Sequence, residues 1–358
     1  MEIKKQTYIF YDVDGTLAQP FQSPPEKLKK VIKGIDKAGI KQILCSGKNK
    51  EYLAGMARSL GIESTSHIIA ENGGVIYDWR KMKIHYKNPD GEKVRKHKEK
   101  ILSEIKGNKF AEEAKETIVT IFMEDLDKTP ALAKRITKAL NDPDLAIKHY
   151  KDGAIDVFHS KVNKGKALEY YFKNLTESSD AQVFTFGDGV NDLEMLEFGT
   201  PVTFADAHPE VIRAVKNRNG LVSEKDGPDG AVEALSNLSS DGLLPEAFNH
   251  IGFAYRPWGS WEVLSTGDGF KVKKMVVKPG LKLSLQKHKH RSEHWFVFEG
   301  TATVTLNGST LKINHGNDIY IRKEAIHRVS NRGKSDLVII EVQRGKYLGE
   351  DDIVKIKE

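Results

Sequence analysis

The sequence predicts an α/β domain built on a parallel sheet and carrying an α+β insertion, followed by an all-β barrel. From residue 7 to about 236, strand-like runs alternate with amphipathic helical stretches, which is typical of a parallel sheet covered on both faces. Between about residues 77 and 160, polar hairpin-like strands and two Lys-rich helices replace this alternation and indicate the insertion. Residues 252–358 contain short strand-like runs between Gly and Asn turns, which favour a barrel or sandwich.

The α/β part begins with a buried strand at residues 7–13. A helix at residues 24–39 follows, opened by proline and closed by glycine, and the next strand and helix lie at 41–46 and 49–61. After the insertion we expect a strand, a helix, a strand and a helix, at residues 183–186, 191–199, 201–206 and 208–217.

The remaining elements are assigned in the same way. Hairpin-like strands of the insertion are expected at residues 75–86, 116–123 and 154–158. A shift towards Ser, Gly and Asn predicts a linker at residues 237–251. The barrel strands are expected at residues 271–277, 281–286, 294–300, 301–306, 318–321 and 337–342.

Composition indicates a globular protein with more than one domain, because 358 residues exceed what one hydrophobic core usually holds. The formal charge of +6 is small, and the Lys-rich stretch 93–106 is interpreted as a solvated helix face, so we expect no nucleic-acid partner. The chain has one cysteine, no signal-peptide pattern and no apolar run near the ~20 residues of a membrane span. We therefore expect a cytoplasmic protein without a membrane partner.

Two carboxylates follow the first predicted strand. Asp12 and Asp14 are separated by one residue, so they point the same way, into the crevice where α/β sheets bind ligands. One can attack as a nucleophile while the other moves protons. Gly15 permits the sharp turn that comes next.

Three further motifs lie at strand ends or helix starts. Ser46 and Gly47 offer a hydroxyl and free backbone N–H groups, which suit a phosphate. Lys164 opens a helix after the insertion, and the carboxylates of residues 187–192 (GDGVND) can hold Mg²⁺. Each motif alone is commonly a turn or a helix cap, but the full set in this order indicates a phosphate-handling site.

Over residues 7–236 these motifs resemble the haloacid dehalogenase superfamily of phosphatases, which implies a Rossmann-like domain with a cap of the larger class. The resemblance makes Asp12 the nucleophile, which forms an aspartyl-phosphate, and Asp14 the general acid and then base. The implied phosphate ligands are Ser46, Gly47, Lys164 and Asn191. The implied Mg²⁺ ligands are Asp12, the main-chain carbonyl of Asp14, and Asp188, with Asp192 in the outer shell.

Residues 71–74 (ENGG) resemble the segment that faces the substrate in sugar-phosphate members, so Asn72 is a candidate substrate residue. The eukaryotic-type phosphomannomutase is a rival within the superfamily, because it shares the first motif and a similar cap. Its signature arginines and its Arg-Asn-Gly-Met cap motif are not found here, and residues 187–192 have the phosphatase form. Hydrolysis is therefore favoured.

The β-only region carries a second set of metal-ligand types. Residues i and i+2 of a strand face the same side, so His288 and His290 are expected to share one ion. Glu293 follows them closely, and His327 comes from a separate hairpin. Three imidazoles and a carboxylate suit a divalent transition metal, namely Zn, Co, Mn, Fe or Ni.

Residues 252–347 resemble the cupin superfamily, a barrel fold. Longer segments at residues 256–260 (RPWGS), 291–295 (RSEHW) and 347–352 (YLGEDD) resemble the isomerase domain of the bifunctional mannose-6-phosphate isomerase/mannose-1-phosphate guanylyltransferase family. The pair of Gln286 and His288 also mirrors a zinc-binding pair in the other class of mannose-6-phosphate isomerase, so Gln286 is a candidate fifth ligand.

The chemistry implied by this resemblance is aldose–ketose isomerisation, in which a metal polarises sugar oxygens while a base moves a proton. Four residues are candidates for this base, namely Glu293, His294, Lys282 and Glu341. Guanidinium forks fit phosphate oxygens. The candidates for binding the sugar's phosphate are Arg256, Arg322, Arg328 and Arg344.

Both halves of the chain can act on the same sugar phosphates. We expect the barrel to convert fructose 6-phosphate into mannose 6-phosphate and the first domain to hydrolyse the product to mannose. Two alternatives stay open: a phosphomannomutase in the first domain, or a barrel that binds sugar phosphates without catalysis. Small-molecule sugar phosphates are the expected partners, and family analogy suggests a homodimer through the barrel.

Overall fold

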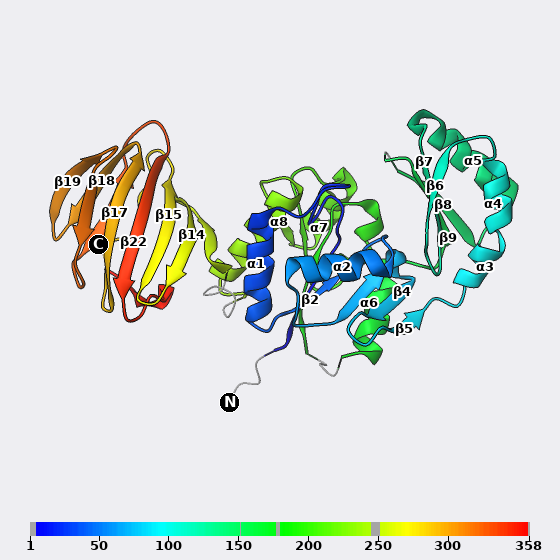
Figure 1. Ribbon diagram of the computed structural model, residues 1–358, viewed down its shortest axis with the longest axis horizontal. Helices are drawn as coiled ribbons and strands as arrows, with labels where there is room; N and C mark the ends of the chain where they lie inside the picture. The colour runs from blue at the N-terminus through cyan, green and yellow to red at the C-terminus, as the bar shows by residue number, and fades with distance from the viewer. Residues whose placement is uncertain (1–4, 151, 177–179, 245–250, 357–358) are drawn as a thin grey trace. The chain divides into compact units, whose positions relative to one another are not determined.

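A computed structural model describes residues 5–150, 152–176, 180–244 and 251–356 (Figure 1). The chain divides into two compact units, Met1–Ala234 and Leu235–Glu358. Helix α8 (Gly227–Ser240) continues past residue 237, where we expected the linker to begin. It continues because Ala231, Leu235 and Leu238 form a fully buried face at helical spacing. The later part of the expected linker, residues 245–250, lies outside the described residues.

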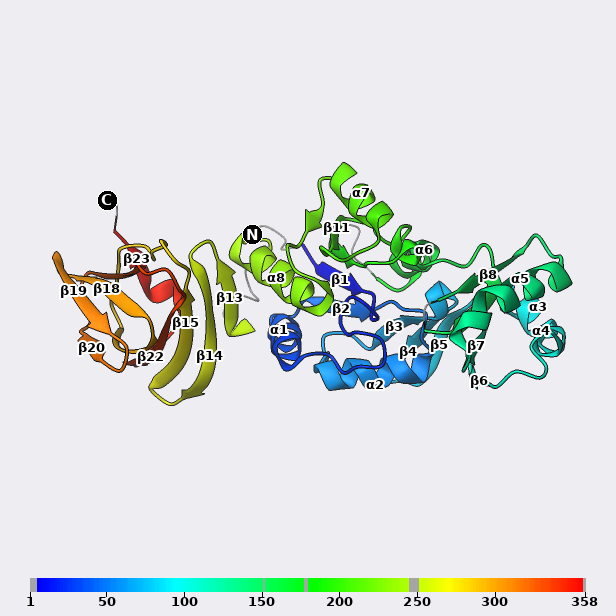
Figure 2. The same cartoon turned by 90° about the horizontal axis from the view of Figure 1, so that it is seen from above.

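The first unit is built on a five-stranded parallel sheet, as its sequence predicts. In spatial order the strands are β12 (Leu221–Val222), β11 (Thr200–Thr203), β10 (Gln182–Phe186), β1 (Thr7–Tyr11) and β2 (Lys41–Leu44). Helices lie on both sides of this sheet (Figure 2). They are α1 (Glu26–Lys37), α2 (Lys50–Leu60), α6 (Lys164–Asn174), α7 (Pro209–Asn217) and α8.

The period of two along β1 explains why both faces are covered. Tyr8 and Phe10 pack against α6 in one apolar cluster. Tyr11 lies on the other face, where its hydroxyl donates to Gln42 Oε1 at 2.9 Å, and Gln42 donates to the carbonyl of Ile32 in α1. The carboxyl ends of these strands are left free between the helices.

Two expectations in this unit are wrong. The hairpin that we placed at the start of the insertion consists of β4 (Val75–Asp78) and β5 (Lys83–Lys87), and it pairs antiparallel with β3 (His67–Ala70) of the core. The helix expected at residues 191–199 is a 3-10 turn, η3 (Val190–Asp192), followed by further turns. The carboxylate of Asp192 accepts the backbone N–H groups at the segment's start, which favours this tight loop.

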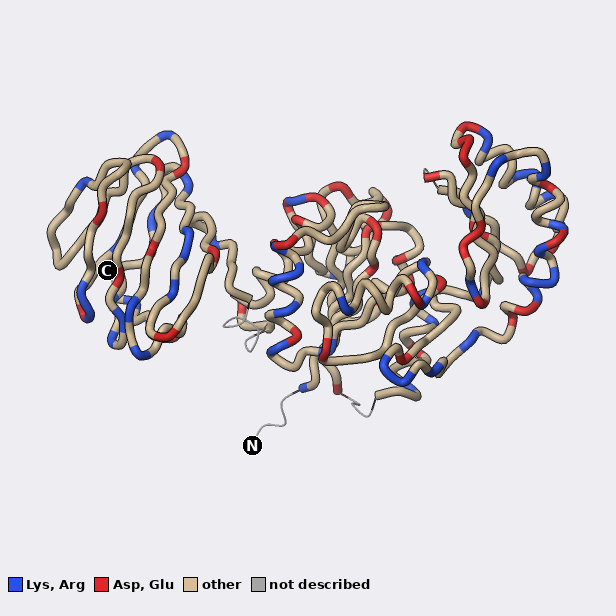
Figure 3. Tube along the Cα trace, in the orientation of Figure 1, with Lys and Arg blue, Asp and Glu red and all other residues tan. Residues whose placement is uncertain are grey.

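The insertion forms a four-stranded antiparallel sheet with three helices on one face, where two were expected. The strands, in spatial order, are β6 (Phe110–Glu113), β7 (Val119–Met123), β9 (Ala154–His159) and β8 (Leu145–His149). The helices are α3 (Gly91–Lys96), α4 (Lys98–Glu104) and α5 (Thr129–Leu140). Acidic and basic residues are interspersed over α3 and α4 (Figure 3), and Val94 and Ile101 are their buried side chains.

The second unit is a barrel of two antiparallel sheets. One contains β13 (Phe253–Arg256), β14 (Gly259–Gly267), β15 (Phe270–Val277), β22 (Leu337–Gly345), β17 (Arg291–Glu299) and β20 (Asp318–Ile321). The other contains β19 (Ser309–Asn314), β18 (Thr301–Leu306), β21 (His327–Asn331), β16 (Gln286–His288) and β23 (Ile353–Lys355). Trp295, Val304 and Ile339 are among the residues of its apolar core. Across the described residues, no helix is both long and apolar enough to cross a membrane.

Candidate active sites

The first candidate site lies at the carboxyl ends of β1 and β10. Lys164, the first residue of α6, is completely buried, and its Nζ lies 2.6 Å from Asp12 Oδ1 and 2.5 Å from Asp192 Oδ1. Burial alone would lower the pKa of Lys164, but the two carboxylates raise it above the ordinary value, so the ammonium stays charged. Three motifs far apart in the sequence therefore meet at one charged group.

Asp188 completes a group of three carboxylates. Ligand atoms of Asp12, Asp188 and Asp192 all lie within 4.8 Å of one another. Burial, together with the neighbouring carboxylates, raises the pKa of Asp188 above the ordinary range. Oxygen donors carrying this excess of negative charge are the set that Mg²⁺ prefers, so the residues fit the expected ion.

Gly15 brings this group together. Its φ of +79° lies in the left-handed region, and a Cβ at this position would stand 2.3 Å from Asp188 Oδ2. Thr16, the next residue, donates its hydroxyl to Asp188 Oδ1 at 3.1 Å. The turn after β1 therefore needs glycine for its backbone and for the approach of Asp188.

Asp14 stands apart from the three carboxylates and is paired with Lys48, whose Nζ lies 3.0 Å from Asp14 Oδ2. Burial raises the pKa of Asp14 above the ordinary carboxyl value, and Lys48 opposes that shift. A half-buried carboxyl with a raised pKa suits a group that gives a proton and takes one back. Lys48 was not among the predicted site residues.

The expected phosphate and substrate residues also converge. Ser46 is buried at the end of β2. A Cβ on Gly47 would lie 3.1 Å from Asn72 Nδ2, and Asn191 Nδ2 donates to Asn72 Oδ1 at 3.4 Å. Asn72 has a φ of +53°, an uncommon conformation for a residue other than glycine. The ENGG segment thus places Asn72 beside the motifs that carry Ser46 and Asn191.

Glu71 has a different role from the one its motif suggested. Its carboxylate accepts the backbone N–H groups of Glu116 and Thr117 at 2.8 and 2.7 Å, and the Thr117 hydroxyl at 2.6 Å. Glu71 is completely buried and so fixes the insertion's connecting segment to the core. A second link is the backbone N–H of Asn49, which donates to Glu113 Oε1 at 3.2 Å.

The insertion contributes polar residues that sequence reasoning missed. Lys115 Nζ pairs with Glu113 Oε2 at 3.0 Å and donates to Thr120 Oγ1 at 2.7 Å, on a side chain that is 3% exposed. Asp156 is buried and accepts from Thr120. The ring of Phe122 on β7 lies 6.5 Å from that of Phe21, so this sheet of the insertion approaches the loop that follows Asp14. These residues lie on or beside short polar strands, which carry no recognisable motif, so they could not be singled out from the sequence.

The second candidate site lies inside the barrel. His288 Nε2 and His327 Nε2 lie 3.0 and 3.4 Å from the two carboxylate oxygens of Glu293, and all three residues are buried. Neither Nε2 has a hydrogen-bond partner, whereas His327 Nδ1 lies 2.9 Å from the Ala325 carbonyl and can donate to it. Orphaned imidazole nitrogens facing a carboxylate fit a divalent transition metal.

His290 does not belong to this group, contrary to expectation. Strand β16 ends at His288, two residues before His290, so the alternation on which the prediction relied does not reach His290. The His290 side chain is exposed and its ring lies 6.0 Å from that of Tyr347. Gln286 shares the buried face of β16 with His288 and pairs with His327 in register, so it is the better candidate for the remaining ligand position.

Glu341 is the candidate base that lies next to this group. It is buried, and it accepts from Trp295 Nε1 at 3.0 Å and from Gln343 Nε2 at 2.9 Å. Trp295 Nε1 also donates to Glu293 Oε2 at 3.2 Å. Burial and the charge of Glu293 raise the pKa of Glu341 above the ordinary value. By contrast, His294 lies on the exposed face of β17, where it pairs with Asp318, and Lys282 is exposed.

The expected phosphate-binding arginines do not converge on the metal group. Arg256 Nη1 donates to Ser240 Oγ. Arg322 and Arg344 are exposed, and Arg328 follows His327 on β21, so it points to the opposite face of the sheet. The guanidinium that does reach the site is that of Arg291, which is buried and donates to Glu293 Oε1 at 3.0 Å.

Family comparisons agree with this division of the chain. A model described as haloacid dehalogenase-like hydrolase matches residues 9–104 and 88–235, which together span more than half of the chain. The chain belongs to the haloacid dehalogenase-like hydrolases. A second model, described as mannose-6-phosphate isomerase C-terminal, matches residues 246–358, so the hydrolase domain is joined to a cupin of that type.

Curated relatives of this hydrolase match it over a limited length. Alginate biosynthesis protein AlgA from Pseudomonas aeruginosa is 43% identical over 138 residues, which is 38% of this chain and 28% of AlgA. Mannose-1-phosphate guanylyltransferase ManC from Salmonella typhimurium is 38% identical over 170 residues, which is 48% of this chain and 31% of ManC. The chain therefore spans less than a third of the length of these relatives.

Solved structures share the fold of the hydrolase domain. A haloacid dehalogenase-like hydrolase from Bacteroides thetaiotaomicron has a TM-score of 0.53 at 19% identity and covers 65% of this chain and 100% of that one. A protein from Thermotoga maritima has a TM-score of 0.52 at 18% identity, covering 65% of this chain and 97% of its own. At these identities the likeness concerns the fold alone.

Proposed function

We propose that this chain is a bifunctional sugar-phosphate enzyme. The cupin interconverts fructose 6-phosphate and mannose 6-phosphate, and the hydrolase domain removes the phosphate from mannose 6-phosphate. The observation that carries the proposal is the position of Lys164 Nζ, which lies 2.6 Å from Asp12 and 2.5 Å from Asp192. A further carboxyl, that of Asp14, stands apart from this group and has a raised pKa. This separation of roles is what a phosphatase with a carboxylate nucleophile needs.

In the first step, an oxygen of Asp12 attacks the phosphorus and the bond to the sugar oxygen breaks. Lys164 holds Asp12 in place and offsets charge on the phosphoryl oxygens. Asp14 gives its proton to the departing sugar oxygen. It then takes a proton from the water that attacks the aspartyl-phosphate, which releases phosphate and regenerates Asp12.

The Mg²⁺ ligands of this mechanism are Asp12, the main-chain carbonyl of Asp14 and Asp188, with Asp192 in the outer shell. Bound Mg²⁺ neutralises charge on the transferred phosphoryl group. The polar face of the insertion, with Lys115 and Asp156, supplies donors and acceptors for sugar hydroxyls. Closure of this face over the site would exclude water from the first step.

In the cupin, Glu341 takes a proton from C1 of fructose 6-phosphate and returns it to C2, while the proton of the O1 hydroxyl passes to O2, which yields mannose 6-phosphate. Trp295 and Gln343 orient its carboxylate. Gln286, His288, Glu293 and His327 would hold a transition metal, and the bound metal would supply polarisation of the sugar oxygens. The names of curated relatives support this reading, since ManC is a mannose-1-phosphate guanylyltransferase and the matched family model is an isomerase domain.

The phosphatase half is tested by phosphate release from mannose 6-phosphate in the presence of Mg²⁺. Asp12→Asn should lower the rate by at least about 10³-fold, because the amide cannot form the aspartyl-phosphate. Asp180→Asn, on an exposed side chain paired with Lys5, makes the same chemical change away from the site and should leave the rate unaltered. Equal rates in both variants would overturn this half.

The isomerase half is tested by Glu341→Gln. The amide fits the same space but cannot take a proton, so isomerisation should fall by about 10³-fold or more while the bound metal remains. His327→Ala should lose the metal as well as the activity. If the Glu341→Gln variant isomerises the sugar phosphate at the wild-type rate, Glu341 is not the base. If the wild-type protein shows no isomerisation, the cupin is a binding module.

A further inference from the structure

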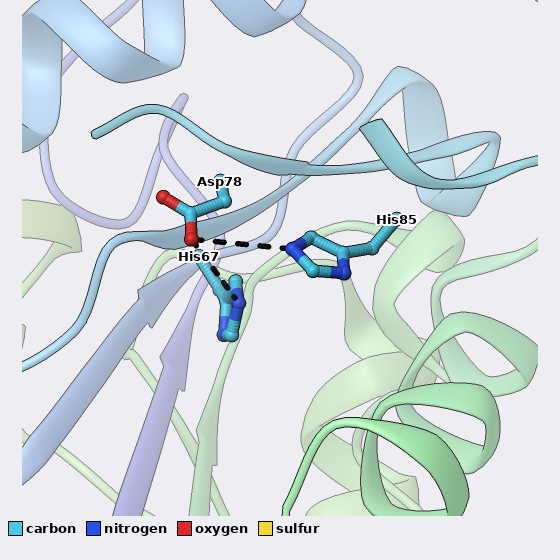
Figure 4. A group of neighbouring side chains, drawn as sticks. All are labelled: His67, Asp78 and His85. Carbon is cyan, nitrogen blue, oxygen red and sulfur yellow. Dashed lines mark ion pairs between the residues drawn. The ribbon is translucent and has the colours of Figure 1, made fainter. Parts of the chain in front are cut away.

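A third group of side chains lies away from both candidate sites, on the three-stranded sheet β3–β4–β5. His67, Asp78 and His85 come one from each strand, and Figure 4 shows both imidazoles turned towards the carboxylate. His67 Nε2 and His85 Nε2 each lie 3.9 Å from the same oxygen, Asp78 Oδ2. The two rings meet edge to face with centroids 5.2 Å apart. The three groups thus converge on one point.

A β-bulge places the third member. Ile76 pairs with Tyr86 and Tyr77 pairs with Ile84, which leaves His85 as the extra residue of β5. Tyr170 donates its hydroxyl to the His85 carbonyl at 3.3 Å and so holds the bulged residue. Bulges re-aim single side chains, and this one turns His85 towards the face that carries Asp78.

The Asp78 carboxylate is also held by the Ser66 side chain and by two backbone N–H groups. Asp78 Oδ1 accepts the backbone N–H groups of Arg80 and Lys81 at 3.1 and 3.0 Å, so Oδ2 faces the histidines. His67 Nδ1 lies 3.3 Å from the Tyr171 hydroxyl, a contact that can fix the tautomer with its lone pair on Nε2. His85 Nε2 is buried and has no hydrogen-bond partner.

Direct ion pairing does not account for this arrangement. A distance of 3.9 Å is too long for a hydrogen bond between imidazole and carboxylate. Lys81 Nζ lies 3.8 Å from Asp78 Oδ2, but its side chain is 75% exposed and can move into solvent.

We propose that His67, Asp78 and His85 bind a divalent transition cation of the Zn²⁺ class. Bonds of about 2.0–2.2 Å set neighbouring ligand atoms of a tetrahedral site roughly 3.4 Å apart, so small side-chain movements close the site. The two histidine side chains are each 19% exposed, so a water molecule would complete the coordination. The ion would tie β3, which precedes Glu71 and Asn72, to the hairpin that leads into the insertion.

The test is Zn²⁺ binding to the full chain, measured by metal analysis after dialysis and by calorimetry, in a background of His288→Ala and His327→Ala that removes the cupin ligands. The background protein should retain about one equivalent of Zn²⁺. Adding His85→Gln or Asp78→Asn should lose it, whereas Lys81→Gln should keep it. Zn²⁺ should raise the melting temperature of the background protein, but not that of His85→Gln.

Tyr171→Phe tests the site without touching a ligand. Loss of the hydroxyl should weaken Zn²⁺ about 10-fold while the folded chain keeps its apolar packing. Co²⁺ in place of Zn²⁺ should give visible absorption bands that disappear in His85→Gln. Equal metal content and equal melting shifts in all variants, with circular dichroism showing that each is folded, would overturn the proposal and leave the group as an unliganded polar cluster.

Discussion

Single residues set the charge balance of the phosphatase site. One buried ammonium, Lys164, faces the carboxylates of Asp12, Asp188 and Asp192. With all three ionised, two negative charges remain uncompensated, and a divalent cation would offset them. Burial and the neighbouring carboxylates of Asp12 and Asp192 raise the pKa of Asp188 above the ordinary value.

Gly15→Ala should abolish phosphate release while leaving the domain folded. The new methyl group would lie 2.3 Å from Asp188 Oδ2, so the Mg²⁺ ligands must separate. Gly39→Ala is a matched control, because Gly39 has a φ of +80° and nothing within 4 Å of an added Cβ. Both variants should lose about 1–2 kcal/mol of unfolding free energy from backbone strain, measured by urea denaturation. Activity lost equally in both would contradict this account of Gly15.

Lys115→Gln should raise KM for mannose 6-phosphate by about 10-fold and leave the hydrolysis of p-nitrophenyl phosphate unaltered. The reason is that Lys115 belongs to the polar face of the insertion, through Glu113 and Thr120, which we propose binds the sugar hydroxyls. Lys109→Gln, on a side chain that is 84% exposed, is the control. Equal losses on both substrates would place Lys115 in phosphate binding instead.

Among single residues, those of the motifs could be predicted from the sequence, because Asp12, Ser46 and Asp188 follow the carboxyl ends of strands in a fixed order. Lys115 and His85 could not be predicted, since their positions depend on the pairing of short polar strands and on a bulge. His290 was wrongly included because strand alternation was extended past the end of β16.

Among the secondary-structure elements, the link between core and insertion depends on one short segment. Glu116 pairs with Lys50 of α2 at 2.9 Å and with Lys87 of β5 at 2.8 Å. Its neighbour Thr117 is bound by Glu71. Strands and helices of the core thus hold the first strands of the insertion through charged and hydrogen-bonded contacts.

Glu116→Gln should destabilise the chain in a pH-dependent manner. Lys87 and Lys50 lower the pKa of Glu116 from 4.5 to about 2. A lowered folded-state pKa stabilises the protein above the unfolded value, so the difference in unfolding free energy between wild type and variant should be full at pH 6 and shrink as the pH falls below about 4.5. Urea denaturation at several pH values measures it, and a difference independent of pH would contradict the ion-pair account.

Element types were predictable where periodicity was strong, as for α1 and β1. The expected helix at residues 191–199 was wrong because side-chain contacts of Asp192 with the backbone override the apolar spacing. The hairpin β4–β5 was assigned to the insertion because sequence polarity does not reveal that β4 pairs with β3.

In the whole molecule, a hydrolase and an isomerase-type cupin share one chain. In the proposed two-step sequence, phosphate release would make the second step irreversible and would draw the isomerisation towards mannose. This effect requires only that both activities are present together, and it does not depend on how the two units are arranged.

The cupin should form a homodimer through the outer face of β17 and β20. Phe296, Phe298 and Tyr320 are 41%, 57% and 54% exposed there, which is a larger apolar surface than isolated residues would give. Light scattering after size exclusion should show a dimer for the wild type and a monomer for Phe296→Glu. Leu311→Glu, on β19 of the other sheet, should remain dimeric. A monomeric wild type at tens of micromolar would contradict this expectation.

The most direct test of the bifunctional account is product analysis by NMR with fructose 6-phosphate, Mg²⁺ and Zn²⁺ or Co²⁺. The account predicts free mannose from the wild type and accumulated mannose 6-phosphate from Asp12→Asn, because that variant lacks the nucleophile but keeps the cupin. Free fructose alone from the wild type, or no product, would contradict the two-step sequence.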